Sequence, residues 1–243
     1  MISVLIGLLV FSTGLFAQDA IPAGTVLPAR LNSSLDSRKS KPGQVITARI
    51  MQDAPLPAGG KIPAGAKVTG HVIDVVSAGS SASISLRFDT VNFRGRSIPV
   101  ITNLRALASM MDVQDAQVPP TGTDRGTPWA WMTTHQIGGE AVYGQGGPVT
   151  NGSRVVGQAA PGGVLVQLGA KPGTNCRGAV EGNDRPQALW VFSSDACGPY
   201  GFPGLEITDA GRTGPLGQIT LASKEGRIHI SGGSGMLLRV DAP

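Results

Sequence analysis

The chain has 243 residues, including 35 Gly and 18 Pro, and 41% of its residues are hydrophobic against 15% charged. This hydrophobic content suffices for a packed core and excludes a disordered chain, and the length suits one large or two modest domains. The net charge of +4 comes from basic residues that are mostly scattered, so we expect no nucleic-acid partner.

The N-terminal segment is predicted to be an export signal. Residues 2–17 are almost wholly apolar and uncharged, and Gln18-Asp19 ends the run. The run is shorter than the roughly 20 residues that span a bilayer, so we interpret residues 1–17 as a signal peptide, the alternative being an uncleaved anchor. This interpretation predicts an exported protein that is periplasmic, outer-membrane-associated or secreted.

Residues 18–105 show the pattern of a β module. Three Pro-Ala-Gly turns punctuate it, and we expect each to be a type I turn with Pro second and Gly fourth. Between them, apolar and polar residues alternate with the period of a strand. The predicted strands are 25–31, 44–51, 67–76, 82–89 and 91–100, the last with a hairpin turn at Arg94-Gly95-Arg96.

The period changes after residue 102. Leu104, Leu107 and Met111 stand at helical spacing, so we predict a short helix over 103–117 with Asn103 as a possible cap. Residues 118–128 are rich in Pro, Thr and Gly and are predicted to form a linker. The predicted division is therefore a β module at 18–105, a helix and linker at 106–127, and a second β module at 128–243.

The second β module is rich in Gly. Short strands are predicted at 163–168, 188–192, 217–222, 227–230 and 236–240, and Lys224–Arg227 is predicted to join two of them as a hairpin. Together the modules predict an all-β fold, with a barrel-like or sandwich module first and one short helix between the two.

Residues 21–104 carry a series of motifs in a familiar order. A Pro-Ala-Gly turn precedes a short strand, Gly-Gln-Val (43–45) opens the next, and Ala-Lys-Val-Thr-Gly-His-Val (66–72) follows a further turn. Phe-Asp-Thr-Val (88–91) and Arg-Gly-Arg-Ser-Ile-Pro-Val (94–100) complete the series. This order resembles the C-terminal β-barrel domain of TrbI-type conjugal-transfer proteins, which are scaffold subunits of the type IV secretion outer-membrane complex. The resemblance implies a β-barrel and an envelope location.

Other features depart from that family. Its members carry an inner-membrane helix, a long Pro-rich stretch and a helical hairpin that forms a pore, and residues 103–117 are too short and polar for the hairpin. The resemblance therefore implies no secretion function. Residues 190–201 and 233–240 resemble segments of uncharacterised exported bacterial proteins, which implies no activity.

The two cysteines, Cys176 and Cys197, are predicted to form a disulfide, because an exported chain with an even number of Cys usually pairs them. The alternative is a reactive thiol with His135 or His229 as its partner. Two Cys at this spacing make no zinc motif.

No catalytic residue, metal site or cofactor is predicted. The three histidines, His71, His135 and His229, lack zinc-motif spacing, and residues 232–236 do not match a nucleophile elbow. A Ser-His-Asp arrangement of scattered residues leaves no sequence signal.

Aromatic residues offer the one candidate binding site. Trp129 and Trp131 would share a strand face, and Tyr143 lies nearby in the sequence, so the three are a candidate platform for stacking on sugar rings or a candidate interfacial belt. The alternative, which we favour, is that the tryptophans pack against a β core.

The function predicted from these features is that of a non-catalytic exported envelope or surface protein that acts by assembly or binding. Its partners would be envelope proteins, further copies of the chain or a glycan, with membrane association at most peripheral. The alternatives are an exported hydrolase without a recognisable motif and a carbohydrate-binding module that uses the tryptophans.

Overall fold

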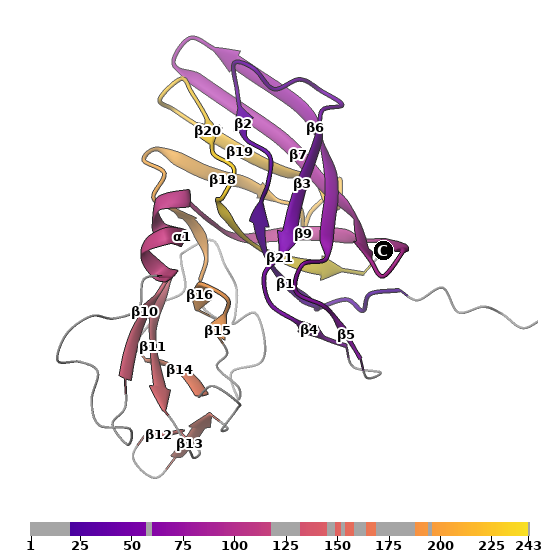
Figure 1. The fold of residues 1–243 in the computed structure, drawn as a ribbon. Helices are drawn as coiled ribbons and strands as arrows, with labels where there is room; N and C mark the ends of the chain where they lie inside the picture. Colours follow the sequence, from indigo (N-terminus) through magenta and orange to yellow (C-terminus); the bar gives the residue numbers. More distant parts are fainter. Residues whose placement is uncertain are drawn as a thin grey trace, which may run out of the picture.

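The structure is a computed structural model that describes residues 20–56, 60–117, 132–144, 149–151, 154–157, 164–168, 188–193 and 196–242 (Figure 1). The described part consists mostly of β-strands, which confirms the predicted all-β class. The predicted signal peptide and the linker at 118–128 lie outside the described residues.

Among the described residues, ten strands form one large sheet. Its order is β17-β9-β21-β1-β3-β6-β7-β19-β18, with β8 attached to β7. Neighbours are antiparallel except β17 and β9, which are parallel. The strands are β1 (Val26–Leu31), β3 (Val45–Ile50), β6 (Lys67–Ala78), β7 (Ser81–Phe93), β8 (Arg96–Pro99), β9 (Ile101–Ala108), β17 (Gly198–Tyr200), β18 (Leu205–Ala210), β19 (Ile219–Ser223) and β21 (Gly235–Asp241).

The remaining elements are short. Helix α1 spans Met110–Gln117, and the small sheets are β2 with β20, β4 with β5, β10 with β11 and β14, β12 with β13, and β15 with β16. Their bounds are β2 (Leu35–Asp36), β4 (Ala54–Pro55), β5 (Lys61–Ile62), β10 (Met132–Gln136), β11 (Gly139–Gly144), β12 (Val149–Asn151), β13 (Arg154–Gly157), β14 (Val164–Leu168), β15 (Ala188–Leu189), β16 (Phe192–Ser193) and β20 (His229–Ile230).

The large sheet curls around the larger of two apolar clusters in the described part of the chain (Figure 1). Alternate residues of its strands point inward, as Ile46, Ala48 and Ile50 of β3 do, and the largest fully buried side chain of this core is Phe88 of β7. The two ends of the sheet approach each other, and a cavity of about 110 Å³ between β9, β17 and β18 marks the seam. The predicted barrel-like shape agrees with this arrangement.

The large sheet crosses the module boundary that the sequence pattern placed at residue 105. Strand β21, near the C-terminus, lies between β1 and β9 and pairs with both. Strands β17, β18 and β19 belong to the same sheet. Residues 198–241 therefore complete the barrel that residues 26–108 begin, and the predicted second module at 128–243 does not form a separate sheet over its last part.

The predicted helix over 103–117 is wrong in its first half. Strand β9 continues to Ala108, and α1 begins at Met110 with Ser109 as its cap, because the Ser109 hydroxyl accepts the Asp112 N–H at 3.1 Å. The helical spacing of Leu104 and Leu107 arises from a β-bulge at Arg105, which restores both leucines to the inner face.

The first and third Pro-Ala-Gly turns are shifted by one residue from their predicted frame, and the second, at 57–59, lies outside the described residues. Thr25 donates its N–H to the Pro22 carbonyl at 3.2 Å, and Ala66 does the same to Pro63 at 3.1 Å. Pro is therefore the first residue and Gly the third, where Gly24 has a φ of 88°. A left-handed third residue is the requirement of a type II turn, so Gly is needed there for its φ.

Candidate functional site

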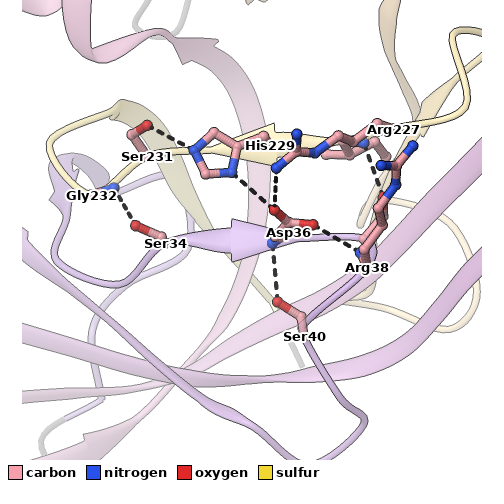
Figure 2. Close-up of polar contacts among 10 residues, drawn as sticks. Ser34, Asp36, Arg38, Ser40, Arg227, His229, Ser231 and Gly232 are labelled. Carbon is pink, nitrogen blue, oxygen red and sulfur yellow. Dashed lines mark hydrogen bonds and ion pairs between the residues drawn. The ribbon is translucent and has the colours of Figure 1, made fainter.

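The first candidate site is a polar cluster between β2 and β20 (Figure 2). Asp36 of β2 is directly opposite His229 of β20, although 193 residues separate them in the chain. This pairing replaces the predicted hairpin, because β20 pairs with β2 while β19 pairs with β7 and β18. The Asp36 side chain is only 8% exposed, so its charge needs nearby partners.

The Asp36 carboxylate has three such partners: Arg227, the Arg38 backbone N–H and His229. The Arg227 guanidinium lies 2.7 Å from its Oδ2, and the Arg38 backbone N–H donates to its Oδ1 at 2.9 Å. The Asp36 N–H in turn donates to the Ser40 hydroxyl. The hydrogen bond from Arg227, followed by that from Arg38, lowers the pKa of Asp36 to about 2 against the opposing effect of burial.

The same cluster contains a Ser-His-Asp chain. His229 Nδ1 lies 3.3 Å from Asp36 Oδ2, and the Ser231 hydroxyl lies 3.3 Å from His229 Nε2 (Figure 2). This is the order of contacts in a serine hydrolase triad. Sequence spacing places His229 and Ser231 on one face but carries no signal for Asp36.

The surroundings of this chain favour a structural role. A hydrolase needs backbone N–H groups beside the nucleophile that are free to hold an oxyanion. Here the Gly232 N–H donates to the Ser34 hydroxyl at 3.0 Å, and the Gly233 N–H donates to the Leu31 carbonyl at 2.7 Å. The Asp36–His229 and His229–Ser231 contacts, each 3.3 Å, are long for a triad ready to act, and His229 is half exposed. The cluster is therefore best explained as a set of structural hydrogen bonds and ion pairs that hold β20 against β2.

The second candidate site is a row of three cations on the outer face of the barrel, Arg30 on β1, Arg49 on β3 and Lys67 on β6. Arg30 is directly opposite Arg49, and Arg49 is directly opposite Lys67. Neighbouring Ala29, Ala48 and Val68 face the core, so these three side chains face outward. Arg49 and Lys67 are exposed and Arg30 is half-buried.

This cation row lacks neutralising partners in the part of the chain that the structure describes. The ion pairs formed there involve other residues, including His71 with Asp89 at 2.9 Å on β6 and β7. Like charges directly opposite one another destabilise a sheet. The row is therefore an energetic cost that the fold itself does not require.

The residues around the row are polar or exposed. Thr47 is opposite Thr69 one step further along β3 and β6, and Val45, 63% exposed, is opposite His71 beyond them. On the other side of the row, Arg30 is opposite Gly235 of β21. Val113 of α1 covers Gly235 so closely that a Cβ added there would lie 2.9 Å from it, so the row ends at this strand. The open part of the face therefore runs over β1, β3 and β6.

The predicted aromatic site is only partly within the described residues. Trp129 and Trp131 lie outside them, and Tyr143 lies in β11 opposite Met132 and Leu165 in the backbone register. The sugar-stacking role therefore stays a prediction. Trp190, by contrast, packs edge-on against Phe192 at 6.4 Å between ring centroids, next to the small apolar cluster under α1.

Other predicted sites stay predictions. Cys176 lies outside the described residues, while Cys197 is buried just before β17, so the disulfide is untested. His135 lies in β10 opposite Glu140. Within the described ranges no three His, Cys, Asp or Glu side chains gather as metal ligands would, and no helix there is long and apolar enough to cross a bilayer.

Comparison with models of known protein families finds no match, and comparison with curated protein sequences finds no significant similarity. The resemblance of residues 21–104 to TrbI-type barrels therefore stays a prediction.

Proposed function

We propose that the protein is an exported, non-catalytic component of the cell envelope that acts by binding an anionic partner on the outer face of its barrel. The leader-like residues 1–17 and the TrbI-type resemblance support the location. The cation row of Arg30, Arg49 and Lys67 supports the mode of action.

The electrostatic repulsion within the cation row is the observation that supports this proposal most directly. Three cations held opposite one another repel, and no described carboxylate lies in contact to offset the repulsion. A partner with several negative groups would remove the repulsion when it binds, and rim charges of this kind also steer the approach of a partner. A rigid sheet holds the three positions without further ordering of the backbone, which lowers the cost of binding.

The test is fractionation of cells that produce either the natural full chain or a variant that lacks the three cations of the row. We expect the natural protein in the envelope fraction at low salt and its release at high salt, because exposed charges are screened there. The variant with Arg30→Gln, Arg49→Gln and Lys67→Gln should be released already at low salt. Lys224→Gln, which removes an exposed Lys elsewhere on the barrel, is the matched control and should behave as the natural protein does.

A natural protein that stays free and monomeric at low salt would contradict the proposal. So would a triple variant that fractionates like the natural protein. Thermal unfolding of each variant shows that a changed distribution does not reflect loss of the fold.

A second candidate function, an exported hydrolase, is favoured by the chain from Ser231 through His229 to Asp36. It predicts turnover of an ester or peptide that Ser231→Ala abolishes. Ser40→Ala should leave this turnover intact, because Ser40 belongs to the same cluster but not to the Ser231–His229–Asp36 arrangement. Our proposal predicts no Ser231-dependent turnover across a panel of esters, peptides and glycosides. Labelling of Ser231 by a fluorophosphonate probe would favour the hydrolase.

A further inference from the structure

We propose that the anionic partner is the phosphate layer of a lipid bilayer, which the barrel meets with the outer faces of β1, β3 and β6. This inference rests on the proposed function and names its partner. It is carried by three observations: the linear arrangement of the cations, the exposed Val45 beside them, and a second group of cations beyond Val45.

The arrangement of the row suits an array of anions more than a single one. Arg30, Arg49 and Lys67 lie on consecutive strands, so their backbones are spaced at about 4.8 Å and the row spans about 10 Å. They stand on the outside of a curved sheet, and the described cavities lie elsewhere, one between the far end of β6, β7, β18 and β19 and one at the seam. A line of separate charges on a convex face can each meet a different phosphate.

Val45 adds an apolar contact to this face. It is 63% exposed, and it points outward from the same side of β3 as Thr47 and Arg49 because Ile46 and Ala48 fill the core. Helices that lie at a membrane interface combine cations with exposed apolar side chains, and this sheet face combines the same two chemical groups. An acidic soluble protein would satisfy the cations equally but gives no reason for the valine.

A second group of cations lies beyond Val45. Lys39 and Lys41 are exposed on the loop before β3, and the Gly43 N–H at the end of this loop donates to the Val72 carbonyl of β6 at 2.8 Å. Val45 therefore lies between the loop cations and the cation row. Juxtaposed cations of this kind attract the negative surface of an anionic bilayer.

Acidic residues on this side of the barrel do not cancel the charge. Asp89, whose Oδ2 lies 2.9 Å from His71 Nδ1, and Asp74, opposite Ser85 further along β6, are two carboxylates against the five cations of the row and the loop. Among the described residues of β1, β3 and β6 there is no Phe, Tyr or Trp on which a base could stack, as nucleic-acid binding usually requires. The face is therefore cationic with one apolar centre.

The expected effects follow from the charge count. One Lys or Arg near an anionic surface changes the partition constant about fivefold, so Lys67→Gln should lower it about fivefold and the triple Gln variant about 100-fold. Val45→Thr exchanges a methyl for a hydroxyl group at the apolar centre and should lower the partition constant for the anionic vesicles severalfold. Lys224→Gln should leave it unchanged.

The experiment is sedimentation of the full chain with large vesicles. One set is phosphatidylcholine alone and the other contains about 30% phosphatidylglycerol, each at low salt and at about 0.5 M salt. We expect binding only to the anionic set at low salt, with the losses given above. A parallel measurement uses polyglutamate, which presents carboxylates without lipid.

Two results would overturn the inference. If the anionic vesicles do not bind, but polyglutamate binds in a manner that the triple variant loses, the lipid partner is wrong and the proposed function stands. If neither binds, or if both bind the triple variant as well as the natural protein, the inference and the proposed function both fail. Unchanged thermal unfolding of the variants excludes misfolding as the cause.

Discussion

Replacement of Arg49 by Gln should stabilise the protein. Arg49 lies in the middle of the cation row, directly opposite Arg30 on one side and Lys67 on the other. The substitution keeps much of the side-chain length and removes two repulsive pairs at once. Replacement of Arg30 or Lys67 removes only one pair and should give about half the effect.

The size of the effect follows from Coulomb's law. Long exposed side chains on adjacent strands keep their charges about 7 Å apart, where the repulsion in water is about 0.6 kcal/mol per pair. At about 0.15 M salt the Debye length is about 8 Å, which reduces each pair to about 0.25 kcal/mol. Two pairs therefore give Arg49→Gln about 0.5 kcal/mol, or a rise in Tm of about 1–2 °C.

The assay is thermal unfolding at three salt concentrations. The gain should approach about 1 kcal/mol at about 0.01 M salt and nearly vanish at about 1 M, because the Debye length falls from about 30 Å to about 3 Å. Lys224→Gln is the control of opposite sign, since Lys224 lies 3.4 Å from Glu206 and its removal loses a weak attraction. An Arg49→Gln variant that is destabilised, or whose gain is the same at every salt concentration, would refute the reasoning.

Three further predictions concern the fold. Because the pKa of Asp36 is lowered from 3.8 to about 2, its ionised form should stabilise the fold by about 2 kcal/mol above pH 4, and this should be lost toward pH 2. Urea unfolding across this range should show that loss in the natural protein but not in Asp36→Asn. Gly70→Ala should cost more than about 3 kcal/mol, since the new Cβ would lie 1.9 Å from the Arg87 carbonyl oxygen. Gly43→Ala, whose Cβ meets nothing within 4 Å but whose φ is +82°, should cost only about 1 kcal/mol in the same thermal assay. Deletion of β21 should abolish cooperative unfolding, as seen by circular dichroism, because it leaves β1 and β9 unpaired on one side.

The sequence predicts the strands of the first half well because one face of each is buried and the other is not. In β3 and β6 the inner residues are apolar and most outer ones, Val45 being an exception, are polar or charged, so the period of two is visible. Strand β9 is buried on both faces, under the core on one side and under α1 and Phe192 on the other. Its alternation is therefore lost, and the bulge at Arg105 produces the spacing of a helix.

The candidate sites are less visible because they depend on pairing between distant segments. Arg30, Arg49 and Lys67 look scattered in the sequence, and only the register of β1, β3 and β6 places them side by side. The pairing of Asp36 with His229 likewise joins opposite ends of the chain. Local periodicity carries no information on such partners, since strand order and register are set by the assembled sheet.

The two charged clusters of this barrel differ in a way that separates stability from binding. Asp36 is buried and surrounded by Arg227, His229 and a backbone N–H, so loss of its charge should weaken the fold. The cations of the row are opposed to one another at the surface, so loss of Arg49 should strengthen the fold and weaken binding. A residue kept for packing lowers stability when it is replaced, whereas a residue kept for a ligand often raises it. Measured together, Tm and vesicle partition should therefore change in opposite directions at the row, while at Asp36 only Tm should change.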